Sequence, residues 1–177
     1  ILYDARNIIE SNFGSDIDYW DVGLLRIWDN KANGWGDGKI DKIFTQLPED
    51  ISIGNATYAK NSPYIIAFDY IDANTGDYAV LGTNTITSET GVIFEQTDLG
   101  YPNFSNKDDK ILFDATTTGG DKVIAMQELA ANKIEAKSGA NASILIPDGK
   151  WGVWYANGTR NLLSDKKDML SFAFPNL

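Results

Sequence analysis

Aromatic and acidic side chains that could bind a ligand are concentrated between Asp16 and Asp41. This stretch holds three of the five tryptophans of the chain, namely Trp20, Trp28 and Trp35. Flat aromatic rings stack on the apolar C–H faces of sugars, and polar groups beside them orient the hydroxyls. Carboxylates are also the ligands that calcium prefers. The stretch therefore indicates glycan binding, calcium binding or both, although the same residues also suit the packing of a loop-rich β protein.

The aromatic residues divide into exposed and buried candidates. Trp35 is flanked by two glycines, which predicts an exposed ring, whereas we expect Trp20 and Trp28 to lie in the core. A second group of aromatics, Trp151 to Tyr155, stands in a strand-like run that would bury some of its rings. The residues predicted to bind a glycan are Trp35, Trp28, Tyr19 and Trp151.

The calcium prediction depends on the glycine-rich part of this stretch. Asp37 and Gly38 are followed two residues later by Ile40, as in the centre of an EF-hand loop. The twelfth position of such a loop would be Phe44, so the bidentate acid is missing. The alternative is a glycine turn whose carboxylates are solvated. The predicted ligands of a structural calcium ion are Asp37, Asp41 and Asp29.

The composition argues against most kinds of enzyme. The chain has no histidine and no cysteine, which excludes a Ser–His–Asp triad, thiolate catalysis and zinc sites built from these residues. A pair of carboxylates could still cleave a glycoside, but no spacing identifies one. We therefore predict that the protein is not an enzyme. The glutamates considered for such a pair are Glu89, Glu95, Glu128 and Glu135.

The net charge of −10 argues against a nucleic-acid partner, because binding to phosphates requires clustered lysines and arginines. No apolar run approaches the 18 or so residues that span a membrane, so we expect no membrane insertion. A length of 177 residues fits one domain, and a hydrophobic content of 43% predicts a globular one. The expected partners are glycans or the surface of another protein.

Short β-rich runs separated by turn residues predict a mainly β, antiparallel sandwich, jelly-roll-like, with one or two short helices. The clearest signal is Tyr64 to Ile71, followed by a turn and a hairpin partner from Asp77 to Asn84. Further strands are expected at 23–28, 92–97, 111–116, 122–128, 143–146 and 150–155.

Two segments are compatible with either a helix or a strand. Residues 1–14 could form a short amphipathic helix, or a first strand around Asn7 to Ile9. Residues 129–136 have strong helix propensity, but the strand that precedes them could instead turn and pair with residues 132–137.

The opening of the chain resembles that of jelly-roll carbohydrate-binding modules. Asn7-Ile8-Ile9 is followed by Phe13 and then by Ile17-Asp18-Tyr19-Trp20, with Phe13 and Trp20 at the separation seen in that family group. Later segments at 61–68, 110–116 and 122–127 are similar to later strands of the family. Similar modules occur in virion tail and fibre proteins, so the resemblance implies recognition at a surface.

The N-terminus also resembles a type IV pilin headpiece, in which an amphipathic helix precedes a β meander. Residues 1–14 would then be the end of a longer helix. The aromatics, the acidic loop and the resemblance to carbohydrate-binding modules together lead us to expect a non-catalytic module, extracellular or on a cell or virion surface, that binds glycans through exposed aromatics and could hold a structural calcium. The alternative is a structural subunit of a pilus-like filament or virion, acting through protein–protein contacts.

Overall fold

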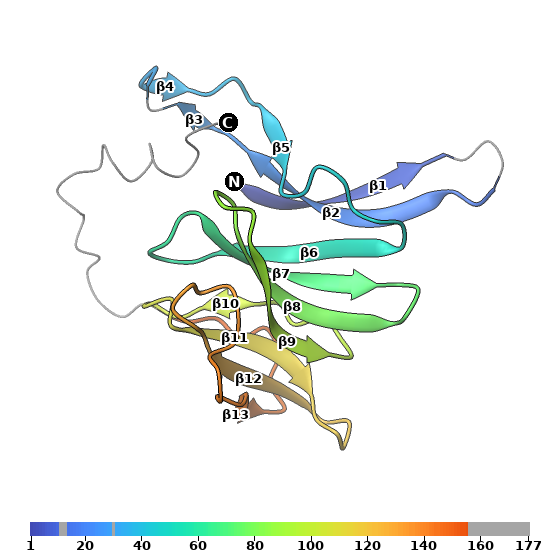
Figure 1. Ribbon diagram of the computed structural model, residues 1–177, viewed down its shortest axis with the longest axis vertical. Coiled ribbons are helices and arrows are strands. Elements are labelled where there is room, and N and C mark those ends of the chain that lie inside the picture. Colours follow the sequence, from blue (N-terminus) through green and yellow to red (C-terminus); the bar gives the residue numbers. More distant parts are fainter. Residues whose placement is uncertain (11–13, 30, 156–177) are drawn as a thin grey trace.

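The computed structural model describes residues 1–10, 14–29 and 31–155, and within these ranges all regular structure is β (Figure 1). Phe13, which belongs to the module-like opening, lies outside the described residues. No helix long and apolar enough to cross a membrane is found in the described ranges. The strands are β1 (Leu2–Ile9), β2 (Ile17–Leu25), β3 (Trp28–Asp29), β4 (Gly34–Trp35), β5 (Ile40–Lys42), β6 (Ile51–Tyr58), β7 (Ile65–Asp72), β8 (Asp77–Asn84), β9 (Thr90–Gln96), β10 (Asn103–Phe104), β11 (Lys110–Thr116), β12 (Lys122–Glu128) and β13 (Ser143–Pro147).

A central antiparallel sheet, β6-β7-β8-β9, has an apolar core on both of its faces. Successive side chains of a strand point to opposite faces, so Ile65 and Ala67 of β7 enter one core while Ile66 and Phe68 enter the other. This double burial explains why β7 begins with four apolar residues in a row, Ile65 to Phe68, and not with an alternating pattern.

The second four-stranded sheet, β10-β11-β12-β13, packs against the central sheet to form a sandwich. Phe113 of β11 contacts Phe94 of β9, with ring centroids 4.7 Å apart. Both four-stranded sheets are meanders, because strands that follow each other in sequence are neighbours in the sheet. The mainly β, sandwich-like fold predicted from the sequence is confirmed.

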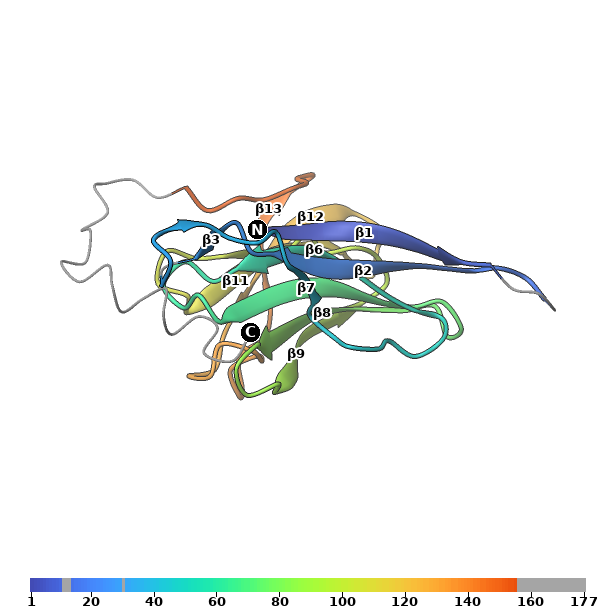
Figure 2. The same ribbon diagram turned by 90° about the horizontal axis from the view of Figure 1, so that it is seen from above.

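The N-terminal sheet, β1-β2-β5, covers the other face of the central sheet through Leu2, Val22 and Leu24. Beyond the N-terminal sheet the chain continues as a two-stranded ribbon, since the Arg26 N–H donates to Lys39 O and β3 pairs with β4. Figures 1 and 2 show the N-terminal strands beside β6, and Figure 1 shows the C-terminal sheet at the opposite end of the molecule.

Several local predictions differ from the structure. The predicted short helices are absent from the described residues. Residues 2–9 form a strand that pairs along its whole length with β2, because this pairing satisfies the backbone of both strands and places Leu2 beside Val22 and Leu24 in the core. Leu129 pairs with Ala136 across a turn, which agrees with the strand alternative for that segment.

The predicted strand at 150–155 is also wrong, because these residues make no ladder and Trp151 has a positive φ of 56°. Strand β6, in contrast, was not predicted. Its polar residues gave little β signal, although it forms one edge of the central sheet.

Candidate functional site

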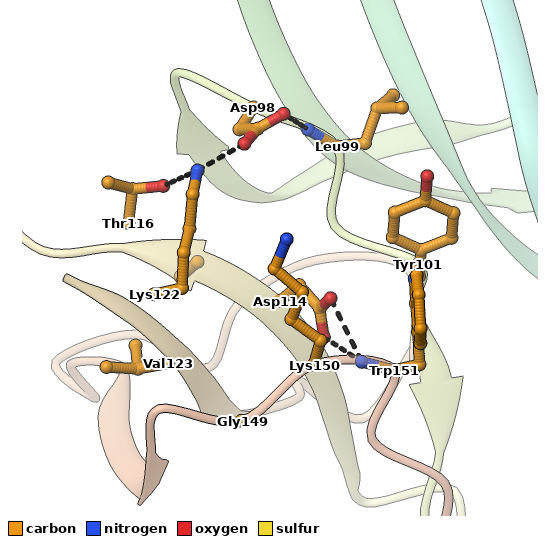
Figure 3. A pocket seen from close by; sticks show the side chains of 11 residues that line it. Asp98, Leu99, Tyr101, Asp114, Thr116, Lys122, Val123, Gly149, Lys150 and Trp151 are labelled. Atoms are coloured by element: carbon orange, nitrogen blue, oxygen red, sulfur yellow. Dashed lines mark hydrogen bonds and ion pairs between the residues drawn. The ribbon is translucent and has the colours of Figure 1, made fainter. Parts of the chain in front are cut away.

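Two aromatic rings from distant parts of the sequence meet at the surface of the sandwich (Figure 3). The rings of Tyr101 and Trp151 lie edge to face at 89°, with centroids 6.5 Å apart. Trp151 is 66% exposed and Tyr101 is 37% exposed. A pair of exposed rings at this angle gives a ligand two differently oriented apolar surfaces.

Each of the two aromatic residues is held through its backbone by a carboxylate of a sheet. Asp114 of β11 accepts the Trp151 N–H at 2.7 Å through Oδ1 and 3.0 Å through Oδ2. Asp69 of β7 accepts the Tyr101 N–H at 3.0 Å and the Gly100 N–H at 2.9 Å. Because both aspartates are on core strands and are buried, they fix the two loops to the rigid part of the sandwich.

Both aromatic residues have backbone conformations that are unfavourable for bulky side chains. Their φ angles are +48° for Tyr101 and +56° for Trp151. Such conformations cost on the order of 1–3 kcal/mol and are concentrated at functional sites. Here the hydrogen bonds to Asp69 and Asp114 compensate the cost. The shared strain is an independent indication that the position of these two rings matters.

The segment that carries Trp151 lies directly on β12 because glycines bring its backbone close. A Cβ atom on Gly152 would be only 2.7 Å from the Cγ2 of Ile124, a buried side chain of β12. The segment therefore covers Ile124 with backbone and leaves the Trp151 ring free to point outward.

A hollow of about 120 Å³ lies beside the two rings. Its polar lining comes from Asp98, Asp114, Thr116, Lys122 and Lys150. Lys122 donates to Asp98 and, at 2.8 Å, to Thr116 (Figure 3). Two lysines and two aspartates balance each other in charge, so the hollow favours neither sign.

The two aspartates of the hollow differ in their acidity. The hydrogen bond from Lys122 lowers the pKa of Asp98 below its ordinary value, and the Leu99 N–H adds to this effect. Burial raises the pKa of Asp114 above its ordinary value, although the N–H groups of Trp151 and Gly152 oppose that shift. Both carboxylates accept hydrogen bonds from the protein itself, and these contacts give each of them a structural role.

The sequence prediction named Trp151, and the structure places it at this site. Trp28 and Trp35, also predicted, meet elsewhere, where their rings lie edge to face on the β3–β4 ribbon with centroids 5.8 Å apart. Tyr19 lies apart from both pairs and accepts a hydrogen bond from Lys42 Nζ at 3.2 Å. The four predicted residues therefore do not form one site.

The prediction that Trp20 and Trp28 lie in the core is wrong, since these side chains are 46% and 44% exposed. The buried residues of β2 are 21–24, and Trp20 comes directly before them, outside the part of the strand that packs on the central sheet. The interior beneath β2 is instead filled by Val22 and Leu24.

The predicted calcium ligands make separate local contacts. Asp37 accepts the Lys39 N–H at 2.9 Å, Asp41 pairs with Lys39 Nζ at 2.9 Å, and Asp29 accepts the Lys31 N–H at 2.7 Å. No group of three or more acidic side chains that could hold a metal ion is found in the part of the chain that the structure describes. In the structure, Asp37 and Asp29 therefore stabilise turns and Asp41 forms an ion pair. Calcium binding stays a prediction.

Three of the four glutamates considered for glycoside cleavage have local partners. Glu128 pairs with Lys137 at 2.8 Å, Glu89 accepts from the Thr87 hydroxyl, and Glu135 accepts from Asn132. None of these glutamates lines the hollow beside Trp151.

The sequence did not single out Tyr101 as a site residue. The available signal was weak, since Gly100-Tyr101-Pro102 marks only an aromatic residue between two turn residues. The role of Asp69 and Asp114 could not be inferred, because a single aspartate inside an apolar strand has no distinctive spacing. Comparisons with models of protein families and with curated proteins find no match for this chain.

Proposed function

We propose that the protein is a non-catalytic module that binds neutral glycans at Tyr101 and Trp151, on an extracellular or virion surface. The observation that carries the proposal is the pair of exposed rings, set edge to face over a hollow with polar walls. The rings would stack on the C–H faces of a sugar. The hydroxyl of Thr116 and the ammonium group of Lys150 line the hollow beside the rings, where the hydroxyls of the sugar would lie.

The balanced charge of the hollow supports a neutral ligand. Lys122 and Lys150 are offset by Asp98 and Asp114, so a free carboxylate or phosphate on the ligand would gain little net attraction. A neutral sugar needs hydrogen bonds of both kinds, and this mixture of donors and acceptors supplies them.

The contacts of the two aspartates support binding without cleavage. A glycosidase needs two carboxyl groups facing the scissile bond, one as acid and one as base or nucleophile. Both oxygens of Asp114 face the Trp151 N–H, and Asp98 is bonded to Lys122 and to the Leu99 N–H. Each carboxylate is therefore used to build the hollow.

A glycan array tests the proposal with three proteins. The wild type is expected to bind a subset of neutral glycans, and Trp151→Ala is expected to lose this binding by tenfold or more, about 1.4 kcal/mol or above. Trp35→Ala is the matched control, because Trp35 is an exposed tryptophan on the β3–β4 ribbon, a separate part of the structure.

Two results would contradict the proposal. One is a wild-type protein that binds no glycan on the array. The other is binding that Trp35→Ala removes and Trp151→Ala leaves intact, which would move the site to the β3–β4 ribbon. Isothermal titration of the best glycan, followed by chromatography of the recovered sugar, separates binding from cleavage.

A further inference from the structure

The carboxylate of Asp69 is fully buried next to the loop that carries Tyr101. Its Oδ1 accepts the Gly100 N–H at 2.9 Å, and its Oδ2 accepts the Tyr101 N–H at 3.0 Å. None of the ion pairs in the described part of the chain involves Asp69. A buried carboxylate without a cation depends on its hydrogen-bond donors, so each donor affects how firmly the loop is held.

Asn55 of β6 supplies a third hydrogen bond to this carboxylate. Its Nδ2 donates to Oδ2 of Asp69 at 2.7 Å, which is the shortest of the three contacts. The same oxygen accepts the Tyr101 N–H. Asn55 therefore fixes the orientation of the carboxylate that binds the backbone of Tyr101.

A β-bulge in β6 directs the Asn55 side chain toward Asp69. Gly54 is opposite Asp69 in the ladder, and the register shifts between Gly54 and Thr57. In a regular strand, the residue after Gly54 would point to the face of the sheet opposite to that of Asp69. Asn55 instead has a φ of +53°, in the left-handed region that asparagine tolerates better than most residues. Bulges that redirect a side chain are frequent next to functional sites.

The N-terminal sheet supports the bulge from its other side. Oδ2 of Asp4, on β1, accepts the backbone N–H of Asn55 at 3.0 Å. A bulged residue lacks a ladder partner, and Asp4 takes the place of that partner. Figure 1 shows β6 between the N-terminal strands and β7. A series of hydrogen bonds thus extends from β1 through Asn55 and Asp69 to Tyr101.

We propose that Asn55 is a positioning residue of the glycan site, which orients Asp69 so that the Tyr101 ring keeps its place beside Trp151. This inference rests on the proposed glycan binding. A ring that is already held in its bound position loses less conformational freedom when the ligand binds, so the complex is tighter. Asn55 is not among the residues that line the hollow, so it acts through Asp69.

Loss of the Asn55 carboxamide changes the acidity of Asp69. Burial raises the pKa of Asp69, the hydrogen bonds from Tyr101, Asn55 and Gly100 lower it, and the charge of Asp114 on β11 raises it. Without the Asn55 hydrogen bond, Asp69 takes up its proton at a higher pH. A protonated carboxyl group gives up part of its acceptor capacity, so the hold on the Tyr101 N–H weakens.

Glycan affinity measured over a series of pH values tests the proposal. The probe is the neutral glycan that gives the strongest signal on the array. Asn55→Gly removes the carboxamide, and glycine adopts a positive φ readily, so the bulge can persist. Compared with wild type, this variant is expected to bind roughly tenfold more weakly at neutral pH. On acidification, its remaining binding is expected to be lost at a higher pH than that of wild type.

Ser52→Ala is the matched control on the same strand. It removes a different side-chain contact of β6, the hydrogen bond that Ser52 Oγ accepts from the Trp20 N–H at 3.1 Å. This variant is expected to follow the pH profile of wild type. If Asn55→Gly lowers the melting temperature but leaves the midpoint of the pH profile unchanged, Asn55 is only structural and the proposal is overturned.

The contact between the two rings gives a second measurement, which needs no glycan. Nuclear Overhauser effects between the ring protons of Tyr101 and Trp151, whose centroids are 6.5 Å apart, are expected in wild type and in Ser52→Ala. They are expected to be weaker in Asn55→Gly. Unchanged effects in Asn55→Gly overturn the proposal. If wild type binds no glycan, the proposed function fails, and the ring contacts alone decide whether Asn55 positions Tyr101.

Discussion

The backbone N–H of Trp151 lies 2.7 Å from Oδ1 and 3.0 Å from Oδ2 of Asp114, a residue 37 positions earlier in the chain. This contact fixes the loop after β13 to the middle of β11. It also determines where the Trp151 ring stands, because the backbone of Trp151 is held in a conformation that a free chain would seldom adopt.

Removing the Asp114 carboxylate should weaken both the fold and glycan binding. Asp114→Ala leaves the Trp151 N–H without this acceptor, so we expect a loss of about 1–3 kcal/mol in the free energy of unfolding and weaker glycan binding. Asp114→Asn keeps one oxygen acceptor and should retain most of the binding. Urea unfolding and glycan titration of both variants measure the two effects. Equal binding by Asp114→Ala and wild type would contradict a positioning role for Asp114.

The strain at Tyr101 predicts an unusual order of stability. At a φ of +48°, glycine is favoured over alanine, so Tyr101→Gly should be more stable than Tyr101→Ala by about 1 kcal/mol. Both variants lack the ring and should lose glycan binding alike. Thermal melting of the two proteins is sufficient for the comparison. If the alanine variant is the more stable, the conformation at Tyr101 is not strained.

The buried carboxylate of Asp69 should make stability depend on pH. Burial raises the pKa of Asp69 above its ordinary value of 3.8, so the native protein holds this proton more tightly than the unfolded chain does. The Asp69 contribution to the free energy of unfolding therefore falls as the pH rises from 3.8 through the raised pKa. Compared with Asp69→Asn, the wild type should gain stability as the pH is lowered through this window. A difference that does not change with pH would contradict the raised pKa.

The Asp98–Lys122 pair should show the opposite dependence. The hydrogen bond from Lys122 lowers the pKa of Asp98, so this pair stabilises the protein above pH 3.8 and loses its effect as the pH falls through the lowered pKa. Since both side chains are partly exposed, the contribution is about 0.2–1 kcal/mol. Melting temperatures of wild type and Asp98→Asn should converge in acid. The pair contributes nothing if the two proteins melt alike at neutral pH.

Calcium removal tests the prediction made from the glycine-rich loop. An ion held only by the native state stabilises it, so a chelator should lower the melting temperature if Asp37 and Asp41 are ligands. Asp37→Asn should then melt at the same temperature with and without chelator. An unchanged melting temperature of the wild type in chelator would contradict calcium binding.

The sequence alone was sufficient to predict most strands of the two four-stranded sheets. Apolar and β-branched runs bounded by turn residues identify β7, β8 and β12, since these strands bury their side chains against a neighbouring sheet. Strand β6 has no comparable pattern. It is recruited as an edge by its pairing with β7, and backbone pairing leaves no mark on side-chain composition.

The stretch from Asp16 to Asp41 shows most clearly where sequence reasoning stops. Its residue types correctly indicated an exposed Trp35 but suggested one functional patch. In the structure the stretch runs through a long ribbon. Trp28 and Trp35 meet at one end of that ribbon, and Tyr19 contacts Lys42 nearer the other. The partner of an aromatic residue depends on strand register, which no composition of a single segment determines.

The sequence by itself determined the class of this protein. Its apolar and β-branched runs predicted a mainly β fold, and the lack of histidine and cysteine excludes a Ser–His–Asp triad and thiolate catalysis. Only the tertiary structure decided which aromatics form a candidate site. Tyr101 and Trp151 are 50 residues apart and meet because Asp69 and Asp114, on two packed sheets, bind their backbones. Hydrogen bonds from buried carboxylates to distant N–H groups arise when the sheets pack, so local sequence patterns cannot reveal them.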